Sequence, residues 1–295
     1  MTASSPLISS GHDLDLSPEC FGELRSSREA RGDAAVLREN LAQDGYLYLP
    51  GFFDRGEILG ARGEFLQRLN KKGALHPDFP VDAAVASPES GAWSRKDIME
   101  GNTRVPSLVF SHQLTAFYEN LLGGPIRPYD HIWIRLVRPG EGTSPHCDLP
   151  YMGRGTRQVM TAWIPYGDVS LELGGLMVLE KSHRQSERIH RYLESDADTY
   201  CVNRNAYKNK RAILSKNPAS LREKFGGRWL TTAFRAGDLL TFGMTTVHAS
   251  LDNQTEAYRI STDTRYQLAA EPIDERWIGP DTAEFAEKNR IGQIC

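Results

Sequence analysis

The sequence predicts a mainly β core preceded by helices. Apolar residues recur at helical spacing in three segments: residues 33–42, the residues that follow Asp54, and residues 114–122. Asp54 can cap the second helix, and Gly123 and the residues after it end the third. Further along the chain, short strand-like runs are separated by Gly- and Pro-rich turns. A chain of 295 residues could hold two domains, but β barrels and sandwiches of this length often form one. We therefore expect a single domain over residues 31–295.

Charge and composition exclude several classes of protein. A net charge of −3, with 40% hydrophobic and 25% charged residues, is typical of a soluble globular protein and shows no bias toward nucleic acid. No window approaches the ~18 apolar residues of a membrane span, and residues 1–30 lack the basic start and apolar core of a secretion signal. The four cysteines show no paired spacing. We expect a cytoplasmic protein with a flexible tail over residues 1–30 and a small molecule as its partner, rather than nucleic acid or a membrane.

Three residues in the strand-rich part form a candidate metal site. His146 and Asp148 follow a strand-like run, residues 132–137, and a turn, so we expect them at the start of a further strand, on the same face. His248 closes another strand-like run about a hundred residues later. Two histidines and one carboxylate form the facial set that suits non-haem Fe(II) and leaves three coordination positions open.

The chain contains a second His-x-Asp sequence, His76 to Asp78. Pro77 lies inside it and Pro80 follows soon after, and proline lacks the backbone donor that a strand needs. We interpret this second sequence as an irregular loop without a metal.

A polar row follows the third candidate ligand. Arg259, Ser261, Asp263 and Arg265 alternate with apolar or hydroxyl residues, so they share one face of a strand. A guanidinium binds carboxylates bidentately, which makes Arg259 a natural anchor for the distal carboxylate of a dicarboxylate cosubstrate. Without the metal motif, a row that faces the solvent would be the simpler interpretation.

At this point the chain resembles the Fe(II)/2-oxoglutarate dioxygenases of the phytanoyl-CoA dioxygenase type. Five segments carry the resemblance, in the family's order: residues 41–52, 140–148, 161–164, 173–183 and 248–261. The last contains the eleven-residue His-to-Arg interval that the family typically shows. Two departures are present, because Cys147 stands where the family often has Gln, and Glu180-Lys181 replaces its usual Pro-Gly.

The resemblance implies a double-stranded β-helix, or jelly roll, flanked by N-terminal helices, and it implies roles for single residues. His146, Asp148 and His248 would bind Fe(II), and Arg259 would bind 2-oxoglutarate, with O2 as the second cosubstrate. Three further residues are candidates for the 2-oxoglutarate pocket: Trp163, Ser250 and, with no firm motif around it, Lys96. Related halogenases carry a small residue at the position of Asp148, so its presence implies a hydroxylase that releases succinate and CO2. Desaturation or ring chemistry remains open.

Residues 181–230 interrupt the strand pattern between the metal-ligand segments. They hold 12 Lys and Arg against 5 Asp and Glu, a net of +7, whereas the remaining residues carry −10. Long insertions of this kind are often lids, and a positive one could attract an anionic substrate, although a solvated excursion would explain it equally well. Arg138 and Arg157 are further candidates for binding such a substrate. Two other functions stay open, a non-catalytic metal-binding module and a zinc hydrolase that uses the same ligands.

Overall fold

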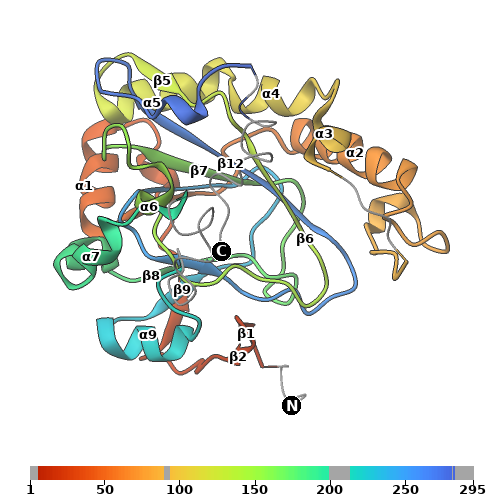
Figure 1. Cartoon of the computed structure of the whole chain (residues 1–295), viewed down its shortest axis with the longest axis horizontal. Coiled ribbons are helices and arrows are strands. Elements are labelled where there is room, and N and C mark those ends of the chain that lie inside the picture. Colours follow the sequence, from red (N-terminus) through yellow and green to blue (C-terminus); the bar gives the residue numbers. More distant parts are fainter. Residues whose placement is uncertain (1–5, 90–93, 199–212, 281, 283–295) are drawn as a thin grey trace.

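The computed structural model describes residues 6–89, 94–198, 213–280 and 282. Two β-sheets form its centre (Figure 1). The larger sheet has the order β4-β10-β7-β12-β5, with β6 also paired to β12, and the smaller has the order β11-β8-β9-β3. The larger sheet consists of β4 (Tyr46–Leu49), β5 (Ile126–Pro128), β6 (Trp133–Val137), β7 (Met160–Pro165), β10 (Leu239–Gly243) and β12 (Arg259–Leu268). The smaller consists of β3 (Phe21–Glu23), β8 (Leu176–Leu179), β9 (Trp229–Thr231) and β11 (His248–Ser250).

Hydrophobic side chains from both sheets meet in one cluster between them. Tyr48, Trp163 and Phe242 come from the larger sheet, and Leu176 and Val178 from the smaller. A second cluster joins the larger sheet to the N-terminal helices, and a third covers the smaller sheet. This two-sheet core with helices on its flank confirms the predicted architecture.

Five α-helices precede β5 in the chain, with β4 between the first and the second, and they lie along the left and upper parts of the view in Figure 1. They are α1 (Ala34–Asp44), α2 (Arg55–Lys71), α3 (Arg95–Met99), α4 (Arg104–Val109) and α5 (His112–Leu122). Asp54 caps α2 as predicted, because its carboxylate accepts a hydrogen bond from the backbone of Glu57. Gly45 ends α1 at φ 81°, and a Cβ there would lie 2.3 Å from the His183 ring, so only glycine fits this turn. Within the described residues, no helix is both long enough and apolar enough to cross a membrane.

The insertion lies between β8 and β9, so its predicted end at residue 230 falls inside strand β9. Its described part contains the 3-10 helix η3 (Ser182–Ile189), α7 (His190–Leu193) and α9 (Pro218–Phe225). Four other short helices occur in the described residues: α6 (Leu149–Met152), η1 (Arg28–Ala30), η2 (Val81–Ala83) and η4 (Glu275–Trp277).

Residues 6–30, expected to form part of a flexible tail, are instead packed on the core. A short hairpin, β1 (Ile8–Ser9) and β2 (His12–Asp13), is followed by β3, which pairs with β9 in the smaller sheet. Leu7 and Leu14 are buried and belong to the cluster over that sheet. Polar composition alone suggested a tail, but two buried leucines and sheet pairing are enough to hold the segment in place.

Candidate metal centre

The three predicted ligands lie together in the structure. The Nε2 atoms of His146 and His248 lie 3.8 and 3.7 Å from Oδ1 of Asp148, and one ligand atom from each residue lies within 4.8 Å of the others. All three side chains are buried. Asp148 is the N-cap residue of α6 and does not continue a strand, because only His146 forms a bridge, with His248, and Pro150 lies in the first turn of the helix. The prediction that His146 and Asp148 share a strand is therefore wrong.

Backbone carbonyls orient both imidazole rings toward this point. Nδ1 of His146 lies 2.9 Å from the carbonyl oxygen of Ser144, and Nδ1 of His248 lies 3.0 Å from that of Thr246. A carbonyl can only accept, so each Nδ1 carries the proton and each Nε2 keeps its lone pair. Burial lowers the pKa of His146 to about 3 and also lowers that of His248. Both rings are thus neutral at pH 7, which is the form that binds metals.

The carboxylate of Asp148 is held in its charged form. Burial by itself would raise its pKa, but the Arg265 guanidinium and the hydrogen bond from the Thr161 hydroxyl favour the charged form and help to lower that pKa below its ordinary range. Two neutral nitrogens and one charged oxygen match the ligand set of non-haem iron. The donor set therefore fits the metal that was predicted.

Arg259 is a buried cation without an anion. It is 1% exposed, and its Nε and Nη1 atoms have no hydrogen-bond partner. Burial, followed by repulsion from Arg135, lowers its pKa to about 10. Within the described part of the chain no carboxylate forms an ion pair with it. An uncompensated buried charge is costly, and a bound carboxylate would offset that cost.

One cavity brings Arg259 and the three metal ligands together, and Trp163 lines it as well. The guanidinium carbon of Arg259 lies 5.9 Å from the centroid of the Trp163 ring, and the indole Nε1 has no partner. Trp163 therefore shares this cavity with Arg259, and its part in binding 2-oxoglutarate stays a prediction. Ser250 is not among the residues that line this cavity; it is buried, and its hydroxyl accepts a hydrogen bond of 2.8 Å from the backbone of Thr143, which does line it.

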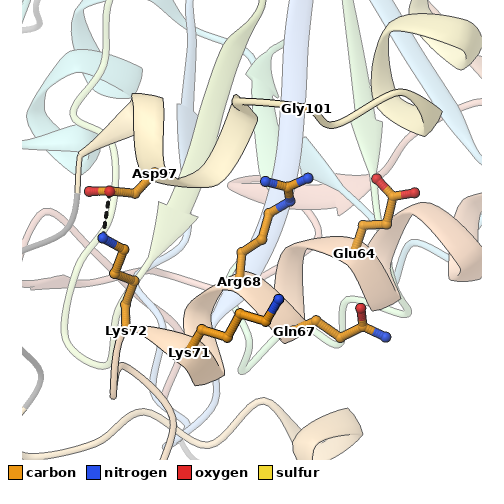
Figure 2. Close-up of a pocket in the computed structure, with 7 residues that line it drawn as sticks. All are labelled: Glu64, Gln67, Arg68, Lys71, Lys72, Asp97 and Gly101. Atoms are coloured by element: carbon orange, nitrogen blue, oxygen red, sulfur yellow. Dashed lines mark ion pairs between the residues drawn. The ribbon is translucent and has the colours of Figure 1, made fainter.

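The other predicted residues lie elsewhere. Lys96 is exposed on α3, and a separate cavity between α2 and α3 contains the ion pair of its neighbour Asp97 with Lys72 (Figure 2). Arg138 lines another hollow, together with His76 of the second His-x-Asp sequence, which lies in a turn region as predicted. Arg157 lines a cavity beside α6. None of these three basic side chains lines the cavity with the triad.

The cavity is also lined by five polar residues to which the sequence analysis gave no role, namely Arg135, Thr143, Thr161, Asp263 and Arg265. The alternation of side chains along the strands carried a signal for them. Thr161 is two residues from Trp163, and Asp263 and Arg265 continue the row that starts at Arg259. Nothing in the sequence indicated what these side chains would contact.

The sequence is similar to those of known proteins. Residues 41–261 match the family model described as phytanoyl-CoA dioxygenase. The 1-deoxypentalenic acid 11-beta-hydroxylase of Streptomyces arenae is 26% identical over 290 residues, covering 94% of this chain and 96% of that protein. Its namesake from Streptomyces exfoliatus is 25% identical over 276 residues, covering 89% and 92%.

Solved structures share the fold. The non-heme alpha ketoglutarate dependent carbocyclase SnoK from nogalamycin biosynthesis aligns with a TM-score of 0.59 at 18% identity, covering 93% of this chain and 96% of that one. The epimerase SnoN from the same biosynthesis aligns with a TM-score of 0.54 at 20% identity, covering 81% and 84%. At these identities the likeness shows the fold alone, and it agrees with the predicted jelly-roll core.

Proposed function

Because the chain belongs to the phytanoyl-CoA dioxygenase family, we propose that it is an iron(II)- and 2-oxoglutarate-dependent oxygenase that hydroxylates an aliphatic carbon of a small molecule. Succinate and CO2 would be the other products. The observation that carries the proposal is the unpaired Arg259 in the same cavity as the His146, Asp148 and His248 triad. A metal site with a purely structural role has no need for a buried cation nearby, and neither does a zinc hydrolase.

Each residue of the cavity has a part in this chemistry. His146 and His248 would bind iron through Nε2, and Asp148 through a carboxylate oxygen, which leaves three positions free. Bound iron supplies the activation of O2, which no side chain can perform. Arg259 would bind the distal carboxylate of 2-oxoglutarate through its unpaired Nε and Nη1 atoms, with Trp163 as a wall that excludes water.

The substrate is proposed to be an anionic small molecule. The two Streptomyces hydroxylases described above are named for a substrate that is an acid. Arg135 lines the cavity and forms an ion pair with the buried Asp263. Because 31% of the Arg135 side chain is still exposed, its positive charge is available to an anionic substrate. The sequence-based candidates Arg138 and Arg157 line other hollows and would bind substrate only outside this cavity.

We also propose that the insertion over residues 181–230 acts as a lid on the metal centre. Its described parts contact both neighbours of His146. The backbone of Leu214 donates a hydrogen bond of 2.8 Å to the carbonyl of Pro145, and the Tyr192 hydroxyl accepts one of 3.1 Å from the backbone of Cys147. A segment anchored at these two points is well placed to respond when the cavity fills.

The test is an anaerobic titration of the metal-free protein with Fe(II) and 2-oxoglutarate. A ketoacid chelated to iron gives a weak visible charge-transfer band, and we expect this band in the wild type but not in Asp148→Ala. Succinate release in air, screened with carboxylic acids, would then identify substrates. Iron binding without the band would contradict the proposal and favour a non-catalytic metal module, and hydrolysis supported by Zn(II) without 2-oxoglutarate would favour the hydrolase.

A further inference from the structure

The two oxygens of the Asp148 carboxylate have different surroundings. Oδ1 faces both histidine Nε2 atoms, at 3.8 and 3.7 Å. Oδ2 accepts a hydrogen bond of 2.5 Å from the Thr161 hydroxyl and one of 3.0 Å from Nη2 of Arg265. The oxygen that faces away from the histidines is therefore already occupied by two protein donors.

The donors to Oδ2 are themselves held in place. Nη1 of Arg265 lies 2.5 Å from the carboxylate of Asp263, whose other oxygen is 2.8 Å from Nε of Arg135. The Arg265 guanidinium carbon also lies 4.5 Å from the centroid of the Trp133 ring. The ion pairs and the packing against Trp133 hold the Arg265 guanidinium in place, so that it donates one hydrogen bond to Asp148 and one to Asp263.

The number of Asp148 oxygens that coordinate the metal determines how many coordination positions stay free for other ligands. Iron in such a site has six positions, of which two histidines and one carboxylate oxygen fill three. A ketoacid chelate needs two of the remaining three, which leaves one for O2. If the carboxylate turned and bound through both oxygens, this last position would be lost.

We propose that Thr161 and Arg265 are positioning residues that keep Oδ2 of Asp148 away from the metal, so that the carboxylate binds through Oδ1 alone. The importance of the free position rests on the proposed function. The hydrogen bonds that hold Oδ2 do not depend on that function, so metal binding without 2-oxoglutarate tests them separately.

The experiment uses Co(II), whose visible spectrum reports coordination number and whose titration gives a dissociation constant. Thr161→Val removes the hydroxyl and keeps the shape of the side chain, whereas Thr161→Ser keeps the hydroxyl. Loss of a donor to a metal ligand typically weakens metal binding about 10- to 100-fold. We expect a loss of about this size in Thr161→Val, with a spectrum that shows an added ligand, and wild-type behaviour in Thr161→Ser.

Thr241→Val is the matched control. Thr241 is buried on β10, the neighbour of β7, and its hydroxyl lies 2.7 Å from that of Tyr118, away from the cavity. This variant loses a buried hydroxyl without touching Asp148, so its Co(II) binding should be unchanged. Equal Co(II) binding in Thr161→Val and wild type, or an equal loss in Thr241→Val, would overturn the role of Thr161.

Arg265→Lys tests the guanidinium while it retains the buried positive charge. A single ammonium cannot reproduce the fork that reaches Asp148 and Asp263 together, so we expect weaker Co(II) binding. Wild-type binding in this variant would remove Arg265 from the assignment. If the protein binds Co(II) as described but never responds to 2-oxoglutarate, the positioning role stands and the proposed oxygenase function fails.

Discussion

Arg259→Met should make the protein more stable and less able to bind 2-oxoglutarate. Burial depresses the pKa of Arg259 from 12.5 to about 10. At about 1.4 kcal/mol for each tenfold change in proton affinity, this corresponds to about 3 kcal/mol. Since the folded pKa lies below the unfolded one, the protonated side chain opposes folding at every pH below about 10. A neutral side chain of similar length avoids this cost.

The measurement is urea denaturation of the Co(II)-loaded protein, with and without 2-oxoglutarate. Without it, we expect Arg259→Met to raise the free energy of unfolding by about 1 to 3 kcal/mol. At 100 times its dissociation constant, 2-oxoglutarate should stabilise the wild type by about 2.7 kcal/mol. The variant should show almost none of this gain, because the guanidinium fork proposed to bind the carboxylate is gone.

Arg265→Met is the control, because both arginines lie on β12, line the same cavity and are 1% exposed. Arg265 has two carboxylate partners, Asp148 and Asp263, so its removal should destabilise the protein by about 3 to 5 kcal/mol. If Arg259→Met destabilises the protein as Arg265→Met does, and still responds to 2-oxoglutarate, then Arg259 is neither an uncompensated charge nor the anchor of the cosubstrate.

Three further predictions concern the backbone and the N-terminal hairpin. Lys181 adopts φ 57° at the position of the family's usual glycine, so Lys181→Gly should raise the free energy of unfolding by about 0.5 to 1 kcal/mol in urea melts. Gly45→Ala should lower the melting temperature by several degrees, since a Cβ there meets the His183 ring and φ is 81°. Deletion of residues 1–14 removes two buried leucines and the hydrogen bonds from the hairpin to Asp252, so it should cost roughly 3 kcal/mol; an unchanged urea midpoint would contradict this.

That the four residues proposed as metal ligands and cosubstrate anchor meet at one cavity could be predicted, because such chemistry is carried by rare residue types at fixed spacing. His146, Asp148, His248 and Arg259 lie in segments whose order along the chain was itself informative. The local backbone was less predictable. His146 lies in a β-bridge and Asp148 is the residue before α6, and the His-x-Asp spacing alone did not distinguish this turn from a continuing strand.

The contacts of Thr161 and Arg265 with Asp148 could not be predicted, because the partners are at least 13 positions apart in the sequence. The same limit explains the error at the N-terminus. Residues 6–30 pair with strand β9 and with the loop after β11, and a polar composition says nothing of such distant partners. Whether such a segment is buried depends on residues that lie far away in the sequence.

The region that matches the family model ends at residue 261, yet strand β12 continues to Leu268 and carries Arg265 beyond that limit. The hairpin at residues 8–13 lies before the matched region, and Ser9 donates a hydrogen bond of 2.7 Å to the carbonyl of Ser250, two residues after His248. A chimera that exchanged only residues 41–261 with a relative would therefore pair a transplanted metal centre with foreign supports at both ends. Exchange points for recombination within this family belong before the hairpin and after β12.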